Sequence, residues 1–78
     1  MMQPKENQEQ RVTLDDRMAW MLPKDVRGIR VVSGQAWVSL GLEDMVVNTK
    51  ETLYIHPDRR GAVITALGHK RLEFELIA

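Results

Sequence analysis

Residues 28–41, GIRVVSGQAWVSLG, carry apolar side chains at every second position, with mixed side chains between them, and are interrupted in the middle by Ser33 and Gly34. A period of two is typical of β-strands, because successive side chains point to opposite faces of a sheet. Ser-Gly between two such runs is typical of a two-residue hairpin turn, which would place Arg30 opposite Trp37 with the guanidinium stacked on the indole. One face of this predicted hairpin carries Ile29, Val31, Ala36, Val38 and Leu40.

The C-terminal stretch GAVITALGHKRLEFEL has the same form and predicts a second hairpin, with Gly68 and His69 in its loop. The inner face predicted for it carries Val63, Thr65, Leu72, Phe74 and Leu76. Between the hairpins lie DMVV, a turn at NTKE and the run TLYIHP, in which Leu53 and Ile55 alternate with polar residues. Pro57 ends this run, because proline cannot donate a hydrogen bond to a neighbouring strand.

The segment VTLDDRMAWMLP is compatible with two structures. One of its aspartates could cap a short helix that carries Met18, Met21 and Leu22 on one side. Alternatively, VTL and MAWML are two strands joined by a polar turn, and Pro23 ends the second in either case. We favour the strands, because every other element that the sequence indicates is a strand.

The chain of 78 residues has room for one domain with one modest core. Residues 1–11 contain too few apolar side chains to offset the entropy lost on ordering, so we expect a disordered N-terminal tail there. Residues 12–78 are expected to form a single all-β domain of several short strands, a sandwich or a barrel.

The sequence also bears on the compartment. The N-terminus lacks the apolar segment of a signal peptide, and no apolar run is long enough to cross a bilayer. The chain has no cysteine, which excludes disulfides, Cys-based zinc sites and a thiol nucleophile. We therefore expect a cytoplasmic protein that does not associate with membranes.

The order of these strands, together with the motif G-x-x-W-V-S at Gly34, Trp37, Val38 and Ser39, resembles the DUF2917 family. That family comprises small bacterial proteins of unknown function that are related to cupins. The resemblance covers about residues 12–76. It implies a small cupin-like antiparallel β-roll or barrel, and it implies no activity.

The relation to cupins implies two metal-binding motifs, G-x5-H-x-H-x3,4-E and G-x5-P-x-G-x2-H-x3-N, with which this chain can be aligned. With the glycine of SGQAWVS as its start, the two histidine positions of the first motif fall on Leu40 and Leu42. In the second motif the spacing holds up to Pro57, but the histidine falls on Ala62 and the asparagine on Ala66. In this alignment every metal-ligand position of the family is replaced.

Little in the sequence indicates catalysis. Only two histidines are present, His56 and His69, whereas a catalytic metal site needs about three protein ligands. The carboxylates occur as adjacent pairs in polar turns, and no serine has an evident base near it, so no group with a perturbed pKa is indicated. We expect no metal, no cofactor and no enzymatic activity.

The run MAWML is apolar on both faces if it is a strand, and a domain with one core cannot cover both. We therefore expect a non-catalytic interaction module that self-associates or binds a protein partner. The candidate interface residues are Met18, Trp20 and Met21, with Trp20 as the anchor.

The alternative function is a small-ligand-binding protein or vestigial cupin-type enzyme that uses the barrel interior. Its candidate ligand contacts are Tyr54, His56, Arg59 and Arg60. The two arginines, with Lys70 and Arg71, are also a candidate basic patch on which Tyr54 and Trp37 could stack bases. Binding of nucleic acid is disfavoured, because the net charge of the chain is zero.

Overall fold

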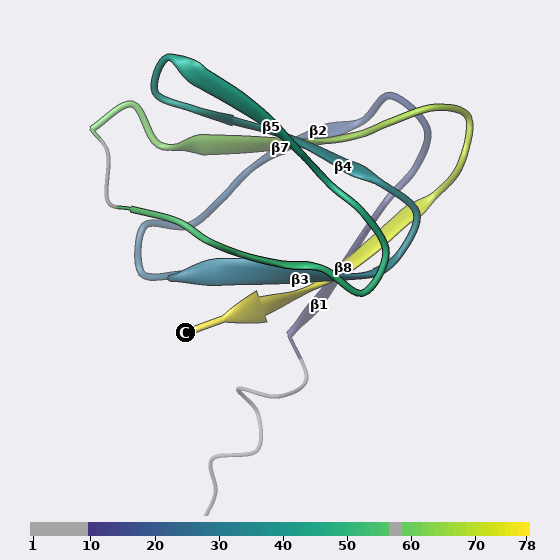
Figure 1. The fold of residues 1–78 in the computed structure, drawn as a ribbon, viewed down its shortest axis with the longest axis horizontal. Coiled ribbons are helices and arrows are strands. Elements are labelled where there is room, and N and C mark those ends of the chain that lie inside the picture. Colours follow the sequence, from purple (N-terminus) through teal and green to yellow (C-terminus); the bar gives the residue numbers. More distant parts are fainter. Residues whose placement is uncertain (1–9, 57–58) are drawn as a thin grey trace, which may run out of the picture.

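The computed structural model describes residues 10–56 and 59–78. They form two antiparallel four-stranded sheets that pack face to face (Figure 1). The strands are β1 (Arg11–Leu14), β2 (Ala19–Met21), β3 (Gly28–Ser33), β4 (Ala36–Leu40), β5 (Glu43–Val47), β6 (Thr52–Tyr54), β7 (Ala62–Ala66) and β8 (Leu72–Ile77). The described residues contain no helix, so the all-β prediction is confirmed.

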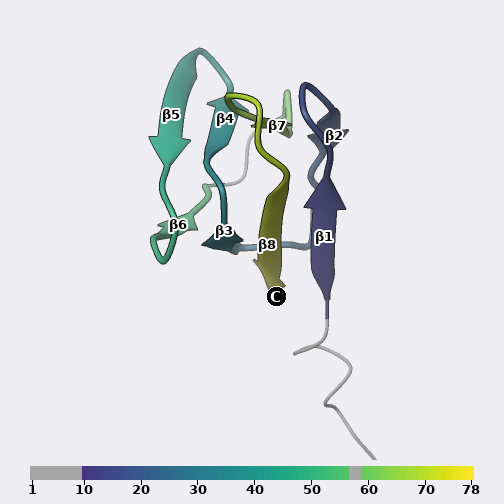
Figure 2. The same ribbon diagram turned by 90° about the vertical axis from the view of Figure 1, so that its right-hand side faces the viewer.

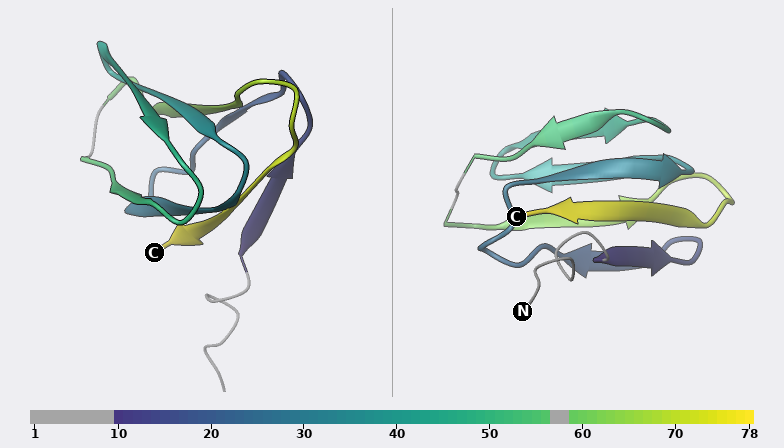
Figure 3. Two further views of the ribbon diagram at one scale, coloured as in Figure 1. Left: turned by 45° about the vertical axis from the view of Figure 1, so that its right-hand side comes forward. Right: turned by 90° about the horizontal axis from the view of Figure 1, so that it is seen from below.

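The first sheet has the order β1-β8-β3-β6 and the second the order β2-β7-β4-β5. Figure 2 shows the two rows of strands, with β5 above β6, β4 above β3, β7 above β8 and β2 above β1. Only β4 and β5 are neighbours both in sequence and in a sheet, and a two-residue turn at Gly41 and Leu42 joins them. Every other pair of successive strands is divided between the two sheets (Figure 3).

The hairpin expected at Ser33 and Gly34 is not formed, and that prediction is wrong. β3 pairs with β8 and β6, whereas β4 pairs with β7 and β5, so the Ser-Gly corner carries the chain from one sheet to the other. Gly34 has a φ of 90°, and a Cβ there would lie 2.6 Å from the backbone oxygen of Arg71. The corner therefore requires glycine at this position, and a hairpin turn would have required it for the same reason, its positive φ. Arg30 and Trp37 consequently lie in different sheets and do not stack.

The second expected hairpin is also wrong, because β7 and β8 lie in different sheets. The connection through Gly68 and His69 is again a corner, in which Gly68 has a φ of 72°. β7 pairs instead with β2 and β4, and β8 pairs with β1 and β3.

Most of the predicted core is confirmed. The inward residues Ile29, Val31, Ala36 and Val38 are fully buried, and Leu40 packs against them. Leu72 and Phe74 of β8 are fully buried as expected. On β7 the prediction is wrong: Ala62, Ile64 and Ala66 face the core, whereas Val63 and Thr65 are only half-buried. The facing of β7 had been derived from a pairing with β8 that does not occur.

The ambiguous N-terminal segment forms the two strands β1 and β2, as favoured, rather than a helix. The amide of Met18 donates to the carbonyl of Asp15 at 3.0 Å and closes the turn between them. β1 begins at Arg11, inside the expected tail, because Arg11 pairs with Glu75 and its guanidinium lies 2.9 Å from that carboxylate. Gln10, also within the expected tail, accepts a hydrogen bond from the amide of Leu76 at 3.0 Å, and the rest of the tail prediction falls on residues 1–9, which lie outside the described residues.

Candidate functional site

The outer surface of the second sheet has few polar groups, and we call it the apolar face. The residues that point outward from its four strands are Ala19, Met21, Trp37, Ser39, Asp44, Val46, Val63 and Thr65. Asp44 carries the single charge among them. On the first sheet, by contrast, Arg11, Glu75 and Arg30 lie side by side across three strands and alternate in charge. The first sheet thus presents a solvated face, and the second presents side chains that water solvates poorly.

Trp37 lies near the middle of the apolar face. Its neighbours on the adjacent strands are Val46 on β5 and Thr65 on β7. Ala19 on β2 lies on the other side of Thr65 in the same row across the sheet. The exposed fractions are 41% for Trp37, 54% for Val46 and 64% for Met21. These values are high for large apolar side chains, so this part of the sheet has a surface that a partner could cover.

The structure separates the three interface residues expected from the sequence. Met21 lies on the apolar face, and Met18 is exposed in the turn that precedes β2. Trp20 points inward, half-buried, with its ring centroid 5.8 Å from that of Phe74 and the rings inclined at 60°. The largest side chain on the outer surface is instead Trp37. The sequence pattern predicts it on the face of its strand opposite to Ala36, Val38 and Leu40, and therefore outside the core.

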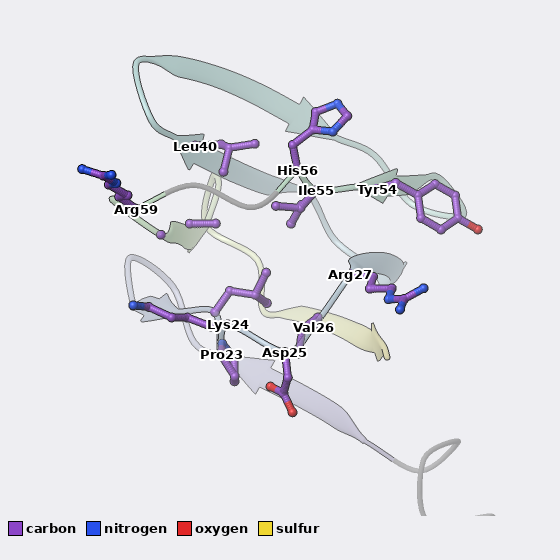
Figure 4. A pocket seen from close by; sticks show the side chains of 13 residues that line it. Pro23, Lys24, Asp25, Val26, Arg27, Leu40, Tyr54, Ile55, His56 and Arg59 are labelled. Carbon is purple, nitrogen blue, oxygen red and sulfur yellow. The ribbon is translucent and has the colours of Figure 1, made fainter.

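A second feature is a hollow of about 850 Å³ at one end of the sandwich, which we call the open end (Figure 4). It lies where β3 and β7 begin and where β2, β4 and β6 end. Its lining comprises Leu22, Pro23, Lys24, Asp25, Val26, Arg27, Leu40, Tyr54, Ile55, His56, Arg59, Gly61 and Ala62. Figure 4 shows Leu40 and Ile55 pointing into the hollow, whereas Arg59 and Tyr54 point away from its centre.

Backbone hydrogen bonds hold the walls of the open end. The amide of Arg27 donates to the carbonyl of Ile77 at 2.6 Å, and the carbonyl of Arg27 accepts from the amide of Ile55 at 2.8 Å. On the other side, the amide of Leu22 donates to the carbonyl of Ala62 at 2.8 Å. These bonds tie the segment between β2 and β3 to both sheets, so the hollow is part of the folded framework.

The opposite end of the sandwich has a hollow with a polar lining. Hydrogen bonds cross it: the side-chain Nε2 of Gln35 donates to the side-chain oxygen of Asn48 at 2.7 Å, and the hydroxyl of Thr49 donates to the carbonyl of Gly34 at 2.8 Å. His69 lies at this end, with its Nδ1 3.3 Å from a carboxylate oxygen of Asp16. Of these two hollows, the open end is the one that combines an apolar interior with a polar rim.

Three of the four ligand contacts expected from the sequence, Tyr54, His56 and Arg59, line the open end, whereas Arg60 is not part of its lining. Lys24 and Arg27 also line the open end but are not predicted from the sequence. The feature that could have identified them is the short charged loop directly after Pro23.

The basic patch considered for nucleic acid is not assembled. Arg59 and Arg60 precede β7, whereas Lys70 and Arg71 follow it at the other end of the strand. The two aromatic rings proposed to stack bases, those of Tyr54 and Trp37, lie on the outer faces of different sheets.

Within residues 10–56 and 59–78, no group of three or more histidine, cysteine, aspartate or glutamate residues is placed to hold a metal ion. His56 and His69 lie at opposite ends of the sandwich. In the same part of the chain, no helix is long and apolar enough to cross a membrane.

Comparisons with known proteins do not connect this chain to a family. No family model matches it, and neither a curated protein nor a solved structure gives a significant match. Its class is thus that of a small β-sandwich of two antiparallel sheets, and its function has to be inferred from the apolar face and the open end.

Proposed function

We propose that this protein is a non-catalytic interaction module that forms a homodimer through the apolar face. The observation that supports this proposal is the presence of one charge among the eight outward residues of the second sheet, against the alternating charges on the first. Removing apolar surface from water stabilises an assembly by about 25 cal/mol per Å². Contiguous exposed apolar surface of this kind is typical of protein interfaces.

The area of the apolar face limits how tightly a second copy of the chain can bind. A standard interface takes about 800 Å² from each partner, roughly one-seventh of the 5516 Å² that this chain exposes. A face of four strands is about 19 Å wide and about 17 Å long, or about 320 Å² in projection, which is below that class and in the range of weak or transient contacts. We therefore expect a weak dimer with a dissociation constant in the micromolar range. The net charge of zero means that two copies do not repel each other at long range.

In such a dimer the two apolar faces pack against each other, as the sheets of a sandwich do, about 10 Å apart. A two-fold axis brings the same surface of both copies together, so a residue near the middle of the face meets its own counterpart or a neighbour of it. Trp37 occupies that position and is the expected energetic centre, because tryptophan is enriched among the residues that dominate interfaces.

The proposal also includes the absence of catalysis, the family resemblance and the cytoplasmic location that are expected from the sequence. The non-catalytic part is supported by the placement of His56 and His69 at opposite ends of the sandwich, where they cannot act together. The resemblance to the DUF2917 family and a cupin-like roll are supported by two packed antiparallel sheets and by the G-x-x-W-V-S residues. A cytoplasmic location is supported by the absence of cysteine in so short a chain.

The test is sedimentation equilibrium on the wild type, on Trp37→Glu and on Thr52→Glu, over a concentration range that spans the micromolar region. Thr52 is the matched control, because it points outward from the first sheet, beside Arg30, and receives the same added charge. We expect the wild type and Thr52→Glu to dimerise and Trp37→Glu to remain a folded monomer.

A wild type that stays monomeric at the highest concentration would overturn the proposal. So would a Trp37→Glu variant that dimerises as tightly as the wild type, because the contact would then lie elsewhere on the molecule.

A further inference from the structure

The open end concentrates positive charge on a molecule whose net charge is zero. Among the described residues of its lining, Lys24, Arg27 and Arg59 contribute three positive charges and Asp25 contributes one negative charge, an excess of two positive charges when His56 is not counted. An excess of one sign around a concave surface attracts ligands of the opposite sign. The ligand that this charge pattern favours is an anion.

The three cations are available to a ligand. Within the described residues, the side chains of Lys24, Arg27 and Arg59 make no hydrogen bond or ion pair. Elsewhere in the molecule, by contrast, Arg71 lies 3.3 Å from the carboxylate of Asp15. An anion at the open end therefore does not have to displace a carboxylate that is already bound.

The interior of the open end is apolar. Leu22 and Ala62 are 5% and 3% exposed and belong to the core, and the half-buried Val26, Leu40 and Ile55 lie around them. No polar side chain belongs to this group. A ligand consisting only of a charged group would gain nothing from the interior, whereas an apolar segment would be removed from water there.

Backbone amides are not free to bind the anion in this part of the site. Those of Leu22, Val26, Arg27 and Ile55 all donate to backbone carbonyls, and Pro23 has no amide hydrogen. Multiply charged phosphates are usually cradled by several free amides. None of these five residues therefore offers an amide to a phosphate, whereas the cationic side chains of the lining can each bind a carboxylate.

We propose that the open end binds a small amphipathic carboxylate. Its apolar segment lies over Leu22, Leu40 and Ile55, and its carboxylate lies at the rim, where a single arginine can bind both oxygens. The volume of about 850 Å³ is within the range of about 300–1,000 Å³ typical of small-molecule sites. This site does not depend on the proposed dimer, because the apolar face is the outer surface of the second sheet.

The test is an NMR titration of isotope-labelled protein with octanoate, run on the wild type and on the Trp37→Glu background. Three further probes separate the contributions: 1-octanol has the tail without the charge, octylammonium has the opposite charge, and butyrate has the charge with a short tail. We expect octanoate to shift the amide signals of Val26, Arg27 and Ile55 in both backgrounds and to bind at least about fivefold more tightly than each of the other probes.

The charge requirement is tested with Lys24→Gln/Arg59→Gln, and the matched control is Lys50→Gln/Lys70→Gln, which removes the same charge near the opposite end. All four side chains are exposed, so both variants should keep the wild-type spectrum. We expect the first variant to weaken octanoate binding about fivefold or more and the control to change it less than about twofold. Added salt should weaken binding to the wild type.

Three outcomes would overturn the proposal. One is equal binding of octanoate and 1-octanol, and another is an equal loss in the two double variants. The third is a set of shifts confined to Met21, Trp37 and Val46, which would show that octanoate only coats the apolar face. A failed dimer proposal would leave the titration on the Trp37→Glu background unaffected, so the two proposals fail independently.

Discussion

Trp20 and Trp37 belong to the same sheet and point to opposite sides of it. Their partners on β7 are the adjacent residues Ile64 and Thr65, so one ring is directed into the sandwich and the other out of it. Trp20 contacts the ring of Phe74, whereas Trp37 is 41% exposed. The two tryptophans therefore contribute differently: one to folding and the other to the surface.

The first prediction concerns this difference. Trp20→Ala should lower the free energy of unfolding by about 3 kcal/mol, because it removes a large ring from the core and its contact with Phe74. Trp37→Ala should lower it by less than about 1 kcal/mol when both are measured by urea denaturation of dilute, monomeric protein. A larger loss for Trp37→Ala would show that its face is covered within the monomer.

The second prediction concerns the central strand of the second sheet. Val38 is fully buried, so Val38→Ala should destabilise the fold by about 1–3 kcal/mol through lost burial and the cavity that remains. Its neighbour Ser39 points outward, and Ser39→Ala should change stability by less than about 0.5 kcal/mol. Equal losses in the two variants, measured by thermal unfolding, would contradict the facing of β4.

The third prediction compares two corners between the sheets. Gly34 and Gly68 both have positive φ, which costs a residue with a side chain about 1–2 kcal/mol. A Cβ at Gly68 meets nothing within 4 Å, whereas one at Gly34 lies 2.6 Å from the backbone oxygen of Arg71. Gly68→Ala should therefore cost about 1 kcal/mol and Gly34→Ala clearly more. If chemical denaturation gives the same loss for both, the corner at Gly34 has room to relax.

The fourth prediction isolates steric contact from backbone strain. Gly28 does not have a positive φ, but a Cβ there would lie 2.5 Å from the backbone oxygen of Leu53 on the neighbouring β6. Gly28→Ala should push β6 away from β3 and cost about 1–3 kcal/mol. The loss of the pairing should appear as faster hydrogen exchange at the amide of Ile55, which donates to Arg27 next to this contact. Unchanged exchange there would mean that the two strands separate without disturbing the open end.

The inward face of β3 and β4 could be read from the sequence, because alternation depends only on local spacing, whereas that of β7 could not, because its prediction rested on a pairing with β8. Ile29, Val31 and Val38 were assigned to the core on that ground, and all three are fully buried. The partner of each strand could not be read in the same way, since a glycine with positive φ serves a hairpin and a corner equally well. Gly34 is a corner, whereas the hairpin in this fold turns at Gly41.

The candidate site shows the same limit. Tyr54, His56 and Arg59 are predicted from the sequence as contacts of a ligand in the barrel interior, and they line the open end. Lys24 and Arg27 join them only because β2 and β3 lie in different sheets, so that the segment between them crosses this end of the sandwich. That proximity follows from the topology, which the sequence pattern did not contain.

The division of successive strands between two sheets has a consequence for how the chain folds. The first sheet is built from strands that span residues 11–77 and the second from strands that span residues 19–66, so neither sheet can be completed from a short segment. A fold dominated by contacts between distant residues is slow to form, typically in milliseconds to seconds, because large loops must close before strands can pair. Apart from the β4–β5 hairpin, the described part of the chain contains no pair of successive strands that could form locally, and we expect the protein to fold in one step in which both sheets gain protection from hydrogen exchange together.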